Sequence, residues 1–132
     1  MEIDHITVPV RNYEAAKAFY ADALKPLGFE ILIDWPDRKR AYLGIPPAPS
    51  SVWIVESTFA GTADLDLALA VEDEASVIAF HTAALAAGAR SLAEPGIRDE
   101  YNSGYYAARI ADFDGNEIEA VYRVAASARV AA

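Results

Sequence analysis

The stretch Asp4-His5-Ile6-Thr7-Val8-Pro9-Val10 decides the fold, because a similar stretch, Leu65-Asp66-Leu67-Ala68-Leu69-Ala70-Val71, follows it at an offset of 61 positions. In both stretches apolar residues alternate with small or polar ones, which is typical of a β-strand with one buried face. A helix-like segment follows each of them. A chain that repeats one supersecondary unit usually folds as two copies of that unit. We therefore expect two similar modules, with functional residues where the apolar pattern is broken.

The repeat continues through the helix-like segments. Asn12 and Asp73 are equivalent, and both are good N-cap residues because a short side-chain oxygen can accept from the first turn. After a one-residue deletion Gly28 matches Gly88, and both positions suit a left-handed residue that ends a helix. Pro26 predicts a distorted last turn in the first helix. The predicted helices span about 13–27 and 74–87, and the predicted strands span 4–10, 29–35, 41–45, 52–56, 65–71, 90–93, 105–112 and 117–123.

Each half of the chain therefore reads β-α-β-β-β, and the last hairpin has the strong turn signal Asp114-Gly115-Asn116. The predicted class is α+β, with two βαβββ modules that form a cupped mixed β-sheet and carry their helices on the outside. A doubly wound α/β fold has too few hairpins to fit this pattern. We expect one domain over 1–132, with module 1 at about 1–58, module 2 at about 64–124 and a tail at 125–132.

Composition excludes several classes of partner and chemistry. The 132 residues contain 11 Lys and Arg against 20 Asp and Glu, which gives a net charge of −9. This charge argues against nucleic acid and anionic membranes as partners. The chain has no cysteine, which excludes disulfides, zinc-thiolate sites and cysteine nucleophiles. We expect no signal peptide, no bilayer-spanning stretch and a cytoplasmic location.

Three residues that can bind a metal ion are expected on one face of the strands. In the first strand His5 lies on the face opposite Ile6 and Val8, and in its repeat Asp66 lies opposite the leucines. If Ile118 of the last strand faces the helices, Glu119 points into the same cavity as His5 and Asp66. One imidazole and two carboxylates form a set of ligands with open positions for a substrate.

The sequence resembles the vicinal oxygen chelate superfamily, which includes glyoxalase I, bleomycin and fosfomycin resistance proteins and extradiol dioxygenases. The resemblance covers nearly the whole chain, and its most specific motif runs from Asp112 to Glu119. It is similar above all to small glyoxalase-like bacterial proteins of unassigned substrate. The resemblance rests on four segments: Asp4-His5-Ile6-Thr7-Val8, Ala18-Phe19-Tyr20 with Leu27-Gly28-Phe29, Tyr105-Tyr106-Ala107-Ala108, and Asp112-Phe113-Asp114-Gly115-Asn116-Glu117-Ile118-Glu119.

The resemblance implies a divalent metal ion held by His5, Asp66 and Glu119, with Glu119 also as the catalytic residue. Asp66 stands where members with a well-formed site often have histidine, and a carboxylate there favours the harder ions. The implied cofactor is one ion of Mg, Mn, Fe, Ni or Zn, or none. The counterpart of Glu119 in module 1 is Trp53, which is no ligand, so the four-ligand site of glyoxalase I is not implied.

The sequence leaves alternatives open for these residues. Glu119 can instead form a buried salt bridge to Arg109 on the neighbouring strand. His5 can be structural, and Asp66 can simply pair with an arginine. Trp35, Tyr42 and Trp53 either belong to the core or form an aromatic wall that stacks a planar ligand. The candidate substrate-binding residues are Tyr42, Trp53, Tyr101, Asn102, Tyr105 and Arg109.

Two functions of different class follow, and the first is slightly favoured because His5 and Glu119 both occupy ligand positions. The first is a metal-dependent lyase, isomerase or transferase acting on a small oxygen-rich substrate, with dioxygenase chemistry less favoured because the chain has only two histidines. The second is a metal-free, bleomycin-resistance-like protein that sequesters a cationic drug. A third reading is an interaction module without a site. In each case the resemblance implies a homodimer.

Overall fold

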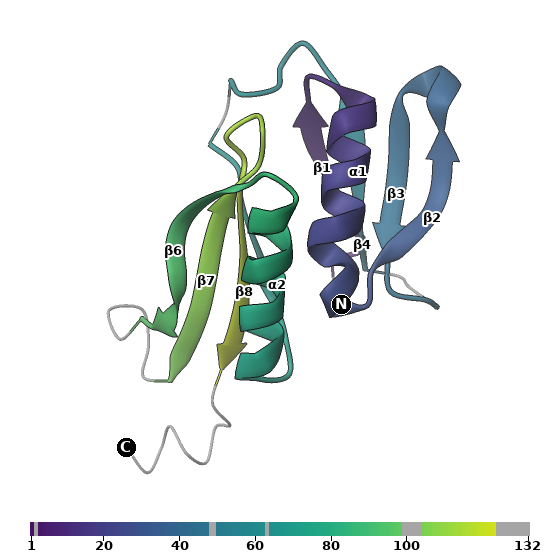
Figure 1. Ribbon diagram of the computed structural model, residues 1–132. Coiled ribbons are helices and arrows are strands. Elements are labelled where there is room, and N and C mark those ends of the chain that lie inside the picture. Colours follow the sequence, from purple (N-terminus) through teal and green to yellow (C-terminus); the bar gives the residue numbers. More distant parts are fainter. Residues whose placement is uncertain (2, 48–49, 63, 99–103, 124–132) are drawn as a thin grey trace.

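The computed structural model describes residues 1, 3–47, 50–62, 64–98 and 104–123. Within this part of the chain, the strands and helices follow one another as two βαβββ units (Figure 1), which confirms the predicted α+β class. The elements are β1 (His5–Val10), α1 (Tyr13–Leu24), η1 (Lys25–Leu27), β2 (Glu30–Trp35), η2 (Pro36–Arg38), β3 (Arg40–Gly44), β4 (Ser51–Glu56), β5 (Asp66–Ala70), α2 (Glu74–Ala86), β6 (Arg90–Ile97), β7 (Tyr105–Ala111) and β8 (Glu117–Arg123), where η marks a short 3₁₀-helix.

The strands form two separate four-stranded sheets, one per module. Their orders are β1-β4-β3-β2 and β5-β8-β7-β6, so the two sheets repeat one topology. In each sheet the first strand pairs in parallel with the last, and the other pairs are antiparallel. The predicted mixed sheet is thus present as two halves, and β1 and β5 are each an edge strand of their own half.

The two helices begin and end as the repeat predicts. The Asn12 side chain accepts from the Ala15 N–H at 3.0 Å, and the Asp73 side chain accepts from the Ser76 N–H at 2.8 Å. Gly28 has φ +90° and Gly88 has φ +108°, which is a backbone conformation that glycine adopts without strain. Pro26 lies in η1, so the distorted last turn of the first helix is confirmed.

One strand is longer than the sequence indicates. The predicted strand at 90–93 continues to Ile97 through Pro95 and Gly96. The pairing of β6 with β7 shifts register twice along this length, and such bulges hide the two-residue period of a strand. β6 is an edge strand, where proline is tolerated because one side of the backbone needs no partner.

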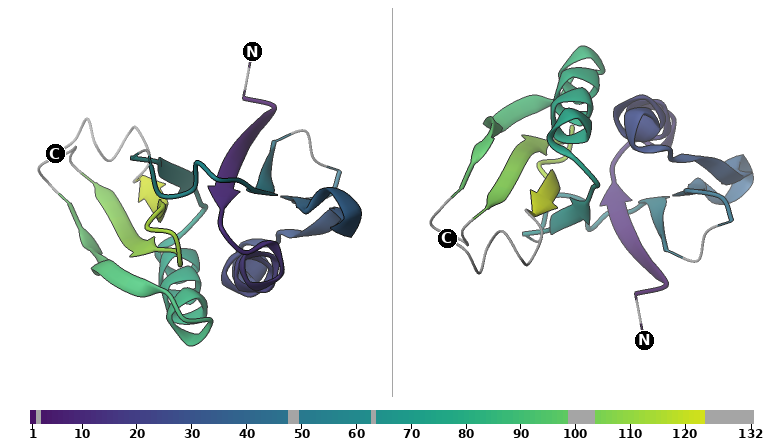
Figure 2. Two further views of the ribbon diagram at one scale, coloured as in Figure 1. Left: turned by 90° about the horizontal axis from the view of Figure 1, so that it is seen from above. Right: turned by 90° about the horizontal axis from the view of Figure 1, so that it is seen from below.

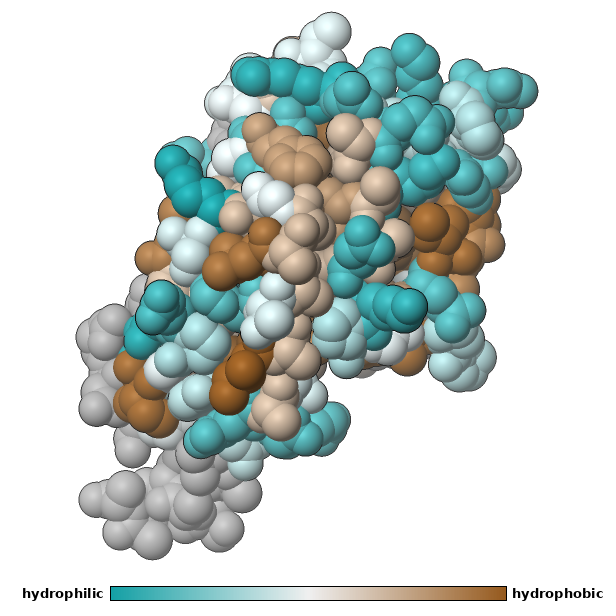
Figure 3. All heavy atoms as spheres, viewed as in Figure 1, coloured by the Kyte–Doolittle hydropathy of each residue, from teal (hydrophilic) through white to brown (hydrophobic). Residues whose placement is uncertain are grey.

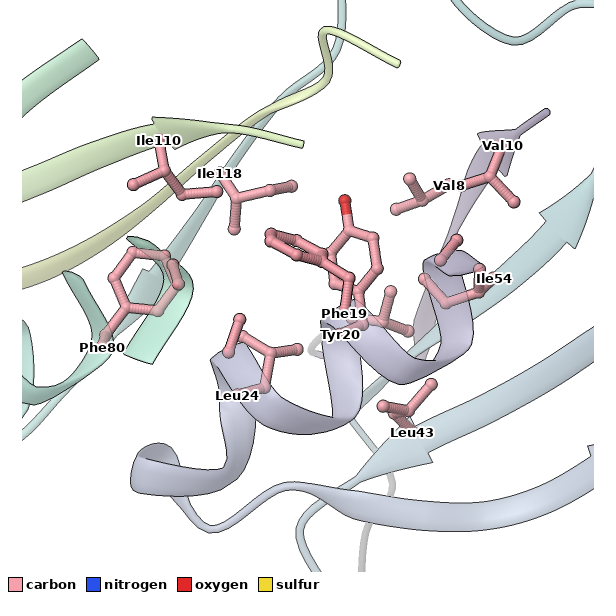
Figure 4. Close-up of a cluster of buried hydrophobic side chains, with 14 of the residues drawn as sticks. Val8, Val10, Phe19, Tyr20, Leu24, Leu43, Ile54, Phe80, Ile110 and Ile118 are labelled. Carbon is pink, nitrogen blue, oxygen red and sulfur yellow. The ribbon is translucent and has the colours of Figure 1, made fainter. Parts of the chain in front are cut away.

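The helices pack against each other and against the inner faces of both sheets, which makes one hydrophobic core (Figure 4). Phe19 and Leu24 of module 1 approach Phe80, Ile110 and Ile118 of module 2 in this cluster. Figure 2 shows α1 and α2 side by side, each covering one face of its own sheet. The opposite face of each sheet carries no helix, and we call it the helix-free face.

A buried polar cluster joins the modules. The Tyr20 hydroxyl of α1 donates to Asp112 Oδ2 at 2.5 Å, and Asn116 Nδ2 donates to the same oxygen at 2.8 Å and to the Pro9 carbonyl at 3.1 Å. Burial, followed by the negative charge of Asp112, raises the pKa of Tyr20 well above its ordinary value, so this hydroxyl stays a donor. The junction therefore has a defined geometry in addition to its apolar contacts.

The helix side of the molecule carries hydrophobic as well as hydrophilic side chains (Figure 3). Figure 3 views the molecule from this side and shows hydrophilic and hydrophobic side chains intermixed over both modules. Neither helix in the described part of the chain is long and apolar enough to cross a membrane. The stacked aromatic rings and the buried ion pair of this protein lie on the helix-free faces.

Candidate functional site

The helix-free face of module 1 carries three stacked aromatic rings. Trp53 of β4 lies opposite Tyr42 of β3 in the register, and their ring centroids are 4.5 Å apart. Trp35, at the end of β2, lies 5.7 Å from Trp53, with the two planes inclined by 33°. Trp35 remains 42% exposed, which is unusual for the largest apolar side chain. We call Trp35, Tyr42 and Trp53 the aromatic wall. None of the three belongs to the hydrophobic core cluster, whereas the stacking of a planar ligand on them stays a prediction.

Two arginines lie along the aromatic wall. The Arg38 guanidinium carbon is 5.2 Å from the centre of the Trp35 ring, and that of Arg40 is 5.6 Å from the centre of the Trp53 ring. Both contacts are cation–π interactions. Arg40 reaches this position because it alternates with Tyr42 along β3 and pairs with Trp35 across the strands. The aromatic wall is therefore cationic as well as apolar.

The helix-free face of module 2 carries a polar triad instead, which consists of Tyr105, Arg109 and Glu119. Glu119 is only 4% exposed, and its two oxygens have different partners. Arg109 Nε donates to Oε2 at 2.9 Å, and the Tyr105 hydroxyl donates to Oε1. Arg109 and Glu119 are direct cross-strand partners of β7 and β8. The salt bridge that the sequence raised as the alternative for Glu119 is thus present.

The three predicted metal ligands lie in different surroundings. His5 belongs to the sheet of module 1, where its Nδ1 lies 2.8 Å from Asp4 Oδ1. Asp66 and Glu119 share the sheet of module 2, and partial burial together with the Glu119 charge raises the pKa of Asp66. Among the described residues no three histidine or acidic side chains are arranged to hold a metal ion. Glu119 is paired with Arg109 and Tyr105 in this structure, and the metal site stays a prediction.

The candidate substrate-binding residues divide between the two faces. Tyr42 and Trp53 belong to the aromatic wall, whereas Tyr105 and Arg109 belong to the polar triad. Tyr101 and Asn102 lie outside the described residues. The residues that sequence reasoning did not select are Arg38 and Arg40, together with Trp35, which it named without committing to a role. Their signal was alternation: Arg40 and Tyr42 share one face of a strand.

A large cavity is lined by none of the residues of the aromatic wall or of the polar triad. It has a volume of about 590 Å³ and lies between the modules, next to Ile6, Leu27, Leu67 and other apolar side chains, with three serines and Glu72 among its lining. A smaller cavity of about 150 Å³ adjoins the polar triad. The large cleft has the volume of a ligand site, but none of the sequence-selected residues that the structure describes lines it.

Solved structures with this fold include proteins of different function. A glyoxalase/bleomycin resistance protein from Albidiferax ferrireducens is 28% identical, with a TM-score of 0.77 over 92% of this chain and 98% of that one. An antibiotic-binding protein from a Streptomyces species is 24% identical, with a TM-score of 0.68 over 94% and 97% of the two chains. A lactoylglutathione lyase from Agrobacterium tumefaciens is 17% identical, with a TM-score of 0.67 over 92% of each chain. The last two show the fold alone.

The search of curated proteins finds no match. The family model "Glyoxalase/Bleomycin resistance protein/Dioxygenase superfamily", by contrast, matches residues 2–120, which span both modules. This match agrees with the repeated βαβββ topology and with the placement of candidate residues on the helix-free faces. The chain therefore belongs to the glyoxalase/bleomycin resistance protein/dioxygenase superfamily.

Proposed function

We propose that the protein binds a small planar molecule on the aromatic wall without a metal ion. The observation that carries this proposal is the stack of Trp35, Trp53 and Tyr42 outside the hydrophobic core, in which Trp35 is exposed and the other two rings are half-buried. Large aromatic rings gathered on one face of a sheet favour a stacking ligand. The likeness to an antibiotic-binding protein is in keeping with this class of function but does not decide it.

The state of Glu119 is the reason to favour binding over metal-dependent catalysis. A carboxylate that binds a metal ion must offer it a free oxygen lone pair. Here Tyr105 donates to one oxygen and Arg109 to the other, so a metal ion would have to share each oxygen with a donor inside a nearly fully buried group. Displacing Arg109 would leave the Glu119 charge uncompensated. His5 is also in the other sheet, and the described residues contain no group of three histidine or acidic side chains that could hold a metal ion.

We further propose that the protein is a homodimer. The aromatic wall and the polar triad lie on separate sheets. The helix-covered faces of both sheets share one core, so the two helix-free faces are the faces that a second copy of the chain can contact. A second copy could place its module 2 against the module 1 of the first and enclose the ligand. Light scattering at micromolar concentration should give twice the mass of the chain, and the mass of a single chain would contradict the dimer.

Metal and ligand titrations of the untagged protein separate the two functions. A metal at 100 times its dissociation constant would stabilise the fold by about 2.7 kcal/mol and raise the melting temperature by several degrees. We expect no such increase with Mg, Mn, Fe, Ni or Zn, for the wild type or for Glu119→Gln. Stoichiometric metal in the native protein, together with stabilisation that is lost in Glu119→Gln, would instead support the metal-dependent enzyme.

Quenching of tryptophan fluorescence reports directly on the proposed ligand site. The chain has two tryptophans, Trp35 and Trp53, and both belong to the aromatic wall. We expect planar aromatic compounds to quench this emission saturably and Trp53→Leu to weaken their binding. Binding seen by calorimetry without any change in tryptophan emission would place the ligand elsewhere, with the cleft between the modules as the next candidate.

A further inference from the structure

The charge along the aromatic wall has the opposite sign to the charge of the chain. The net charge of −9 would by itself suggest a cationic ligand. The side chains that stack on the two indoles are nevertheless arginines, Arg38 on Trp35 and Arg40 on Trp53. Neither has a carboxylate within salt-bridge distance among the described residues, whereas the neighbouring Lys39 pairs with Glu56 at 3.1 Å. A ligand on the aromatic wall therefore meets cations first.

Arg40 also has a hydrogen-bonding group without a partner. Its Nε is buried, and the described part of the chain supplies no acceptor for it. That atom is closed to solvent and therefore to a ligand as well, but Arg40 as a whole is only half-buried. Its terminal N–H groups are the donors that a ligand on the aromatic wall can reach, and the described residues form no salt bridge with them.

We propose that the aromatic wall selects a planar aromatic ligand that carries an anionic oxygen group, such as a carboxylate. The ring stacks on Trp53 and Trp35, and the anionic group accepts from Arg40, with Arg38 adding positive charge from the exposed side. Guanidinium groups suit this task because they present several donors in a plane. The inference rests on the proposed function, since it assigns a ligand class to the same aromatic wall.

Three para-substituted nitrobenzenes whose fourth-position substituent is anionic, neutral or cationic test this proposal. Para-nitrobenzoate, para-nitrobenzyl alcohol and para-nitrobenzylammonium share one ring that quenches tryptophan, so one titration of the wild type measures all three. We expect the anion to bind about tenfold more tightly than the alcohol at low ionic strength, and the cation to bind most weakly. The difference should shrink in 0.15 M salt because Arg38 is exposed to solvent.

Matched variants assign the preference to one side chain. Arg40→Gln should lower the affinity for the anion about tenfold and leave that for the alcohol within about twofold, because the ring contacts remain. Arg40→Lys should retain part of the preference. Arg90→Gln, with the same charge change on β6 of the other module, should leave all three affinities unchanged. Should Arg40→Gln fail to fold, Arg38→Gln is expected to reduce the same preference by a smaller factor.

The outcomes separate this inference from the proposed function. Equal affinities for the three ligands, or tighter binding of the cation, would overturn the anionic ligand class while the aromatic wall remained the binding site. Failure of all three to quench tryptophan at millimolar concentration would remove the aromatic wall as a site, and the proposed function with it. An anion preference that persists fully in Arg40→Gln and in Arg38→Gln would show that other groups recognise the charge.

Discussion

The helix-free faces of the two modules have opposite chemistry at equivalent positions. Trp53 pairs with Thr7, and Glu119 pairs with Ala68, which is the repeat partner of Thr7. The same place in the βαβββ unit thus holds an indole within an open aromatic stack in one module and a buried, paired carboxylate in the other. The inner faces differ far less, because Phe19 and Phe80 occupy equivalent core positions. The two modules thus match on the side that forms the common core and differ on the helix-free faces.

Removing the cation of the polar triad should have the largest effect on stability. Arg109→Met leaves Glu119 buried without its charge partner, and we expect a loss of about 3–5 kcal/mol in the free energy of unfolding measured with urea. The matched change on the other face is Arg38→Met, which should cost less than about 0.5 kcal/mol because Arg38 is exposed. Similar losses in both variants would mean that the two faces do not differ in their structural role.

Cutting the junction between the modules should have an intermediate effect. Tyr20→Phe removes the hydroxyl that donates to Asp112 and leaves a buried carboxylate oxygen with one donor fewer, so we expect a loss of about 1–3 kcal/mol. Tyr122→Phe, on a half-buried ring, is the control and should change the free energy of unfolding by about 0.5 kcal/mol or less. Two separate unfolding transitions in Tyr20→Phe would show that this cluster makes the two modules unfold together. A free energy of unfolding equal to that of the wild type would show that the hydrogen bond does not stabilise the junction.

The helix caps should give the smallest difference in stability between the modules, and this difference should depend on pH. Asn12→Ala should cost about 1 kcal/mol at every pH between 2 and 7, because an amide cap does not titrate. Asp73→Ala should also destabilise at pH 7. The hydrogen bond from Ser76 lowers the pKa of Asp73, so the stability that this cap adds is present above the ordinary pKa and is lost as the pH falls through the lowered value.

Urea unfolding of both cap variants at pH 7 and at pH 2 is the measurement. At pH 2 the effect of Asp73→Ala should shrink while that of Asn12→Ala persists. If both effects kept the same size at pH 2, the Asp73 cap would not act through its charged carboxylate.

The helices and the sheet faces that they cover could be predicted from the sequence, because each local signal agreed with the repeat. Asn12, Asp73, Gly28 and Gly88 mark the helix ends, and alternation in β1 and β5 identifies the buried face. The end of β6 was missed, since Pro95 is read as a strand breaker when the edge position is unknown. Local sequence patterns thus predicted the helices and strands wherever these were regular, and failed where β-bulges interrupt β6.

The site was less predictable because side-chain partners depend on contacts between strands. Alternation placed Glu119 on the correct face, but it could not decide between a metal ion and Arg109 as the partner of a carboxylate. The net charge of the chain pointed to a cationic ligand, because a sum over the whole sequence does not register that Arg38 and Arg40 gather at one aromatic surface. Local charge had to be read from the register of β2 and β3.

The buried cluster of Tyr20, Asp112 and Asn116 explains why membership of the superfamily does not identify the ligand of this chain. Asp112 and Asn116 lie in the segment that most clearly marks the family, and their side chains are spent on holding one half of the molecule to the other. The most recognisable segment of this chain therefore serves the junction between its modules, and it carries no information about which ligand the helix-free faces bind.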